Sequence, residues 1–227
     1  MSKANNMRLA AFQHADSFFP SGAVSFSWGL ETMCNQGLVS TKQDLHGFIR
    51  AQLINRWSGF ERPALVHAHA AARDFDKLEA LDWLIEAQTL AAEQRDGSQR
   101  MGTALLTIHS KLMTPGAQAY RARVHNGQAA GHLPVAQGLV WSGLGFDAGL
   151  AQQMAAHGLC TSLLGAAIRL AVIGHVDAQQ VLAELHPLIE EVLSRPVPEP
   201  DALHSFVPQT DIASMNHETD DMRLFAN

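Results

Sequence analysis

Histidines are the first candidates for chemistry in this chain, because imidazole binds transition metals and transfers protons near neutral pH. The 227 residues include twelve histidines and two cysteines. Two ligands on one helix face must be three or four residues apart, and no two histidines have that spacing. His67 and His69 would diverge by about 200° on a helix, and His186 with Glu190 makes a single i, i+4 pair. The sequence therefore predicts no local metal site, although histidines converging from separate helices would leave no local pattern.

Patterns typical of catalysis are also absent from the sequence. The segment Ser25-Phe26-Ser27-Trp28-Gly29 approaches the Gly-x-Ser-x-Gly turn of hydrolases, but Ser25 occupies the position of the first glycine. No lysine follows a glycine, which excludes an ordinary phosphate-binding loop. The acidic pairs at 190–191 and 220–221 would point about 100° apart on a helix, which does not indicate acid/base catalysis. Two classes remain: an interaction protein, and an enzyme whose site is assembled from distant residues.

The composition also limits the partners and the cellular location that we expect. Sixteen basic residues face 22 acidic ones for a net charge of −6, and the lysines are scattered, so no nucleic-acid partner is expected. The longest apolar run, 147–169, contains Gln152 and His157, which argues against a membrane span. The N-terminus lacks the pattern of a signal peptide, and Cys34 and Cys160 have no partner at metal or redox spacing. We therefore expect a soluble, cytoplasmic protein.

Helical periodicity extends along most of the chain, because apolar residues recur three and four positions apart. Expected N-caps are Thr41, Asp74 or Asp76, Asp147 and Asp177. Gly97 is expected to interrupt a helix, and Thr114-Pro115-Gly116 to end one. We expect helices over about 41–60, 63–69, 74–90, 98–112, 117–124, 132–144, 147–172 and 177–195. With short helices before and after Pro20, the chain is predicted to be a single-domain all-α bundle of about eight to ten helices.

Residues 196–227 differ from the rest of the chain. Prolines at 196, 198, 200 and 208 precede a polar run that ends in Leu224-Phe225. Because proline at this density resists regular structure, we expect an all-α domain over 1–195 followed by a C-terminal tail without a core helix. An apolar pair on a polar tail is a candidate docking element, and the alternative is that the tail packs back on its own helices.

Three separated stretches carry distinctive combinations of residues. The first, residues 16–31, reads Asp-Ser-Phe-Phe-Pro-Ser-Gly-Ala-Val-Ser-Phe-Ser-Trp-Gly-Leu-Glu. The second, residues 169–175, reads Arg-Leu-Ala-Val-Ile-Gly-His, with Gln179 downstream. The third, residues 208–218, reads Pro-Gln-Thr-Asp-Ile-Ala-Ser-Met-Asn-His-Glu and is followed by Arg223-Leu224-Phe225. In this order the stretches resemble the UreF family of urease accessory proteins, and residues 92–98 are similar to that family's central helix junction.

Two positions depart from the family pattern. His175 stands where the family usually has glutamine. Asp220-Asp221-Met222 replaces a more usual Tyr-Ser before Arg223, which removes an aromatic ring and adds two negative charges. Both departures lie where contact with a partner is expected.

The resemblance implies an all-α protein, usually a homodimer, that is not an enzyme. Proteins of this family are adaptors that join UreD, called UreH in some organisms, to the GTPase UreG. The assembly loads nickel into apo-urease when GTP is hydrolysed, so the complex handles the nickel and the chain itself is expected to bind no cofactor. The alternative is an α-helical enzyme, or a nickel-binding protein, with a site assembled from distant residues.

We assign no catalytic, cofactor-binding or metal-ligating residue from the sequence. The residues expected at a partner interface are Ser25, Ser27, Glu31, Glu93, Arg95, Arg169, His217, Glu218, Arg223, Leu224 and Phe225. In the last stretch, Leu224 and Phe225 are expected to be apolar anchors against UreD, because interfaces gain most of their binding energy from a few buried side chains. Glu218 and Arg223 are expected to make charged contacts beside them.

The remaining charged candidates lie in or beside predicted helices. A charge is costly in an apolar helix unless it is paired, so Arg169 is expected either to meet a carboxylate or to emerge at an interface. Glu93 and Arg95 are adjacent to the predicted break at Gly97 and are expected to be exposed.

Overall fold

The structure is all-helical, as the sequence predicts. This computed structural model describes residues 3–16, 19–20, 26–218 and 224–225. In these ranges there are eleven α-helices, one π-helical turn and one 3-10 turn, and no strand. The elements are α1 (Lys3–Ala15), α2 (Leu30–Asn35), α3 (Lys42–Gln52), the π turn η2 (Leu53–Trp57), α4 (Glu61–Ala70), α5 (Phe75–Gln88), α6 (Ala92–Lys111), α7 (Ala117–His125), α8 (Leu133–Gly143), α9 (Ala148–Arg169), α10 (His175–Ser194), the 3-10 turn η3 (Pro200–Ala202) and α11 (Pro208–His217).

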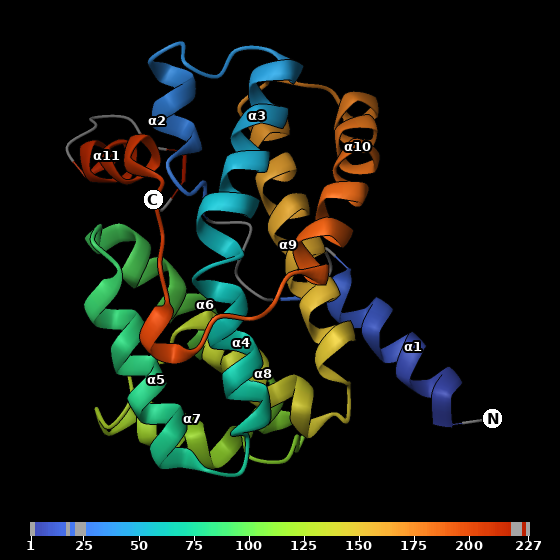
Figure 1. Ribbon diagram of the computed structural model, residues 1–227, viewed down its shortest axis with the longest axis vertical. Helices are drawn as coiled ribbons and strands as arrows, with labels where there is room; N and C mark the ends of the chain where they lie inside the picture. Colours follow the sequence, from blue (N-terminus) through green and yellow to red (C-terminus); the bar gives the residue numbers. More distant parts are fainter. Residues whose placement is uncertain (1–2, 17–18, 21–25, 219–223, 226–227) are drawn as a thin grey trace.

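The helices pack around one continuous apolar core. In the upper half of Figure 1, α3, α9 and α10 run side by side, and α11 lies against α2. In the lower half, α8 is surrounded by α4, α5, α6 and α7. α1 contacts α9 and extends away from the body at the lower right. Buried apolar side chains from α1 through to Phe225 near the C-terminus belong to the same cluster.

Side-chain caps explain where several helices begin. Thr41 and Asp44 form a capping box at the start of α3. The carboxylates of Asp74 and Asp147 accept hydrogen bonds from the backbone N–H groups of residues 77 and 150, which satisfies donors at the starts of α5 and α9. The α10 helix begins at His175, two residues before the N-cap predicted at Asp177.

The structure corrects one prediction about a helix break and one about the C-terminal stretch. α6 runs without interruption through Gly97, so the predicted break there is wrong. The eleven helices of the described residues agree with the predicted all-α bundle of about eight to ten. The last stretch also contains a helix, α11, that the proline content led us not to expect. Pro208 is the first residue of that helix, where its missing N–H would have no partner within the helix.

Glycine permits the close approach of helices in the lower half of the molecule. A Cβ atom at Gly138 of α8 would lie 2.5 Å from the carbonyl oxygen of Leu65 and 2.7 Å from the Cβ of Ala68, both in α4. A Cβ at Gly102 of α6 would lie 2.1 Å from the carbonyl oxygen of Gly131. Backbones therefore touch directly at these crossings, and any side chain would separate them.

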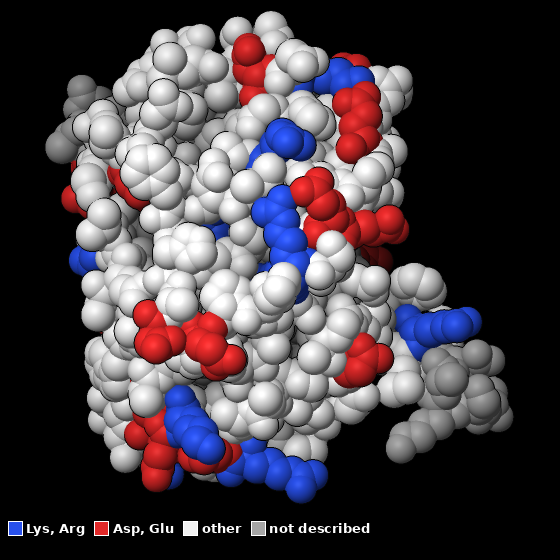
Figure 2. Space-filling model, in the orientation of Figure 1, with Lys and Arg blue, Asp and Glu red and all other residues white. Residues whose placement is uncertain are grey.

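In the part of the chain that the structure describes, no helix is long and apolar enough to cross a membrane. Figure 2 shows acidic and basic side chains interspersed on one face, with large uncharged areas between them.

We predict that Gly138→Ala lowers the free energy of unfolding by about 2 kcal/mol, because the new methyl group overlaps the backbone of α4. The matched control is Gly158→Ala, since a Cβ at this position in α9 would meet no atom within 4 Å. The control is expected to change stability by less than about 1 kcal/mol, and in the stabilising direction. Urea unfolding followed by circular dichroism measures both, and equal stability of the two variants would contradict the close-packing argument.

Candidate functional site

The buried imidazole of His217 contacts two carboxylates from distant parts of the sequence. His217, the last residue of α11, is fully buried. Its Nδ1 lies 2.9 Å from Glu93 Oε2 of α6, and its Nε2 lies 3.1 Å from Glu31 Oε2 of α2. The side chain of Glu31 is 5% exposed and that of Glu93 is 11% exposed, so solvent screens these contacts little. The ring can donate to both carboxylates at once only as the imidazolium cation.

The Glu31 carboxylate also binds the backbone of Leu224 and Phe225. Glu31 Oε1 accepts a hydrogen bond of 2.7 Å from the backbone N–H of Leu224, and Oε2 accepts one of 3.1 Å from that of Phe225. Hydrogen bonds to an ionised carboxylate are stronger than those between neutral groups. Glu31 therefore joins two parts of the C-terminal stretch, the end of α11 and the dipeptide 224–225.

Leu224 and Phe225 face opposite environments. Phe225 is 5% exposed and joins the apolar core. The guanidinium carbon of Arg169, at the end of α9, lies 4.3 Å from the centre of the Phe225 ring, which is a cation–π contact. Leu224 is 61% exposed. We call Glu31, Glu93, Arg169, His217, Leu224 and Phe225 the C-terminal anchor.

A polar network attaches α11 to the neighbouring helices. Gln94 of α6 donates 2.9 Å to Ser214 Oγ and 3.3 Å to Asp211 Oδ1. Gln52 of α3 donates 2.7 Å to Thr210 Oγ1. Burial raises the pKa of the Asp211 carboxyl, because its charged form loses hydration. α11 is thus held by hydrogen bonds as well as by its apolar face.

Gly29 allows α11 to lie directly on the turn before α2. Its φ angle is +77°, a left-handed conformation that favours glycine. A Cβ at Gly29 would lie 3.0 Å from both Ser214 Oγ and the Thr210 carbonyl oxygen. The Trp-Gly-Leu-Glu segment of the first stretch therefore makes both the turn and the carboxylate that receive the C-terminal stretch.

The structure places the other predicted interface residues in different settings. The prediction that Glu93 and Arg95 are exposed is wrong, because the Glu93 side chain is 11% exposed and that of Arg95 is 31% exposed. Arg95 is half-buried and donates to the carbonyl oxygens of Thr89 and Leu90, at the end of α5. Ser27 is fully buried, and Glu218 is exposed. Ser25 and Arg223 lie outside the described residues.

Sequence reasoning missed the amide side chains that hold α11. Gln52 continues the apolar stripe of α3 formed by Leu45 and Ile49, and it is 3% exposed. Gln94 is 1% exposed and also contacts the buried guanidinium of Arg56. A polar residue at an apolar position of a helix is the signal that could have identified both, because a buried amide needs hydrogen-bond partners.

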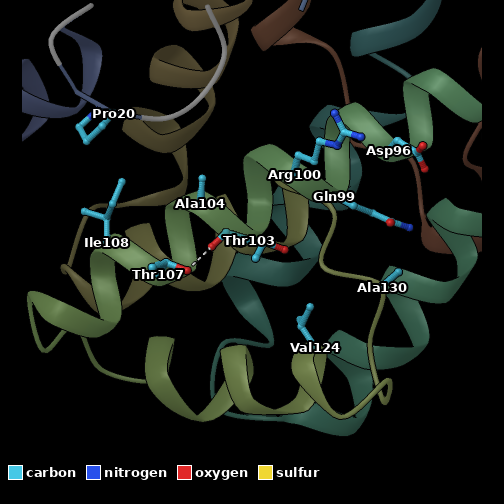
Figure 3. Close-up of a pocket in the computed structure, with 10 residues that line it drawn as sticks. All are labelled: Pro20, Asp96, Gln99, Arg100, Thr103, Ala104, Thr107, Ile108, Val124 and Ala130. Atoms are coloured by element: carbon cyan, nitrogen blue, oxygen red, sulfur yellow. Dashed lines mark hydrogen bonds between the residues drawn. The ribbon is translucent and has the colours of Figure 1, made fainter. Parts of the chain in front are cut away.

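A separate groove of about 930 Å³ lies along α6 (Figure 3). The ionisable side chains among its described lining residues are Asp96 and Arg100, and Thr103, Thr107 and Ile108 line its other end. Thr107 Oγ1 donates to the backbone carbonyl of Thr103, so this hydroxyl stabilises its own helix. The groove brings together no nucleophile with a general base.

Comparison with known proteins identifies the relatives of this chain. A family model described as UreF matches residues 39–186. The chain is 35% identical to a urease accessory protein UreF of Trichodesmium erythraeum over 229 residues, which cover 97% of each protein. It is 31% identical to a UreF of Yersinia enterocolitica, covering 96% of this chain and 97% of the relative. It is 32% identical to a UreF 1 of Brucella melitensis, covering 96% and 92%.

We predict that His217→Ala lowers the free energy of unfolding by about 3 kcal/mol, because it leaves two nearly buried carboxylates without the imidazole that both contact. Glu218→Ala is the matched control, since the neighbouring side chain is exposed. Urea unfolding of the two variants measures the difference. Equal stability of the wild type and the His217 variant would show that the anchor contributes nothing to the fold.

Proposed function

Because the chain belongs to the UreF family of urease accessory proteins, we propose that it is a non-catalytic adaptor for nickel insertion into urease. In this proposal it joins UreD, or its equivalent UreH, to the GTPase UreG, and the assembly delivers nickel to apo-urease. The chain acts as a chaperone of metallocentre assembly and functions as a homodimer. GTP hydrolysis belongs to UreG, and nickel is handled by the assembled complex.

The C-terminal anchor is the observation that carries this proposal. Glu31, Arg169 and His217 come from the three stretches that resemble the family, and they converge on one site. The groups at this site hold a chain end and offer no paired nucleophile and base. Such an arrangement is more typical of a protein that binds other proteins than of an enzyme.

An apolar surface accompanies the anchor. Leu224 is 61% exposed, and Ile212 and Met215, one turn apart on α11, are 57% and 41% exposed. The opposite face of α11, with Thr210, Ala213, Ser214 and His217, is buried, and exposed apolar side chains on such a docked helix mark a surface for protein–protein contact. We assign UreD to this surface, with Leu224 as its central contact.

Co-expression with UreD and UreG tests the proposal. We expect a ternary complex on size exclusion, and nickel-dependent urease activation that requires this chain. Deleting residues 208–227 is expected to abolish co-purification of UreD, because it removes both α11 and the anchored dipeptide. Retention of UreD by the truncated chain would reject the assignment of this surface, and urease activation without the chain would reject the adaptor role.

We predict that Leu224→Asp weakens UreD binding by about 2 kcal/mol, or about thirtyfold, because it places a charge in a desolvated apolar contact. The substitution leaves the backbone N–H that bonds Glu31 in place. Leu112→Asp is the matched control, since Leu112 is 56% exposed and lies at the opposite end of α6 from Glu93. Titration of immobilised UreD with each variant measures the affinities, and equal weakening by both would remove Leu224 from the interface.

A further inference from the structure

Two histidines far apart in the sequence meet ring to ring between α1 and α6. His14 Nε2 lies 3.2 Å from His109 Nε2, although 95 residues separate them. His109 is fully buried and His14 is half-buried, so one side of the pair is open toward solvent. Neither residue takes part in the C-terminal anchor.

The outer nitrogen of each ring already has an oxygen partner. His14 Nδ1 lies 2.7 Å from the carbonyl oxygen of Ala10, which can only accept, so this nitrogen carries the proton and Nε2 presents its lone pair to His109 when the ring is neutral. His109 Nδ1 lies 2.8 Å from Thr114 Oγ1, a hydroxyl oxygen that can accept a hydrogen bond from an Nδ1–H group. In the tautomer that carries this Nδ1–H group, both inner nitrogens present lone pairs to one point, whereas in the other tautomer His109 Nε2–H donates to His14 Nε2. Histidines that bind metals usually have such oxygen partners on the other nitrogen.

The spacing of the inner nitrogens fits one shared ion. Metal–imidazole bonds of about 2.0–2.1 Å and the 3.2 Å separation give an angle of about 100° at the ion, between octahedral and tetrahedral values. A straight N–H···N hydrogen bond would place the ring centres about 5.5 Å apart, whereas they are 5.0 Å apart. The two rings are therefore not collinear, and their planes differ by 20°, which is compatible with two adjacent ligands of one ion.

The surroundings favour the neutral rings that metals bind. The ring centre of Phe19 lies 4.7 Å from that of His14, and the ring of Phe146 meets His14 edge-on at 5.8 Å. Burial lowers the pKa of both imidazoles, that of His109 to about 4.

We propose that His14 and His109 form a two-histidine site for a divalent transition-metal ion of the imidazole-binding class, such as Ni²⁺, Zn²⁺ or Cu²⁺. Water completes the coordination on the side of the half-buried His14. Among the described residues no three His, Cys, Asp or Glu side chains are grouped to hold a metal, so the pair stands without a further protein ligand of these types. A site with only two protein ligands is expected to release its ion more readily than one with three or four. The site goes beyond the adaptor role, which does not require this chain to bind a metal.

Titration of the purified full-length chain with Ni²⁺ at neutral pH tests the site. Calorimetry is expected to give one site per chain that His14→Ala abolishes. X-ray absorption at the nickel edge is expected to show two imidazole ligands. Because this assay contains no UreD, UreG or urease, its failure is distinct from failure of the adaptor proposal.

Thr114→Val supplies a second variant that leaves both ligands in place. Removing the hydroxyl that orients His109 is expected to weaken Ni²⁺ binding by about tenfold. The matched control is His125→Ala, an exposed histidine on α7, which is expected to leave the site unchanged. If the wild type binds no Ni²⁺, or if His14→Ala binds it as tightly as the wild type, the pair is only hydrogen-bonded and the proposal is overturned.

Discussion

The placement of an imidazole between two carboxylates is the constraint on which the upper half of the molecule depends. Glu31 and Glu93 lie 62 positions apart in the sequence, and each nearly buried carboxylate needs a cation or donors close by. His217 supplies them, but only if α11 lies across the ends of α2 and α6. The docking of the C-terminal stretch is thus a condition for burying two acids.

The glycines of the lower half impose a different kind of constraint. At Gly138 and Gly102 the neighbouring backbone comes closer than any side chain allows, so α4, α6 and α8 have one tight arrangement. This half provides a rigid support for α6, whose first turn carries Glu93 and Gln94. Close packing in one half therefore fixes the position of groups that bind the chain end in the other.

Local sequence patterns predicted most of the helices. They failed where contacts between residues distant in the sequence determine the structure. The capping box at Thr41 and the cap at Asp147 act within one turn, so they could be recognised directly. Gly97 was misjudged because its helix is stabilised by burial against other elements, which no local propensity records. The pairing of His14 with His109 could not be derived from spacing, because it depends on how α1 lies on the folded core. The family resemblance selected Glu31, Glu93 and His217 but did not indicate that both glutamates contact the histidine.

The way Glu31 holds the chain end has an evolutionary consequence. Its carboxylate bonds the main-chain N–H groups of residues 224 and 225, and every amino acid except proline offers that donor. Mutations can therefore change the side chain at the exposed position 224 while the attachment of the chain end is inherited intact. The exposed side chain at this position can diverge between lineages without a matching change in Glu31.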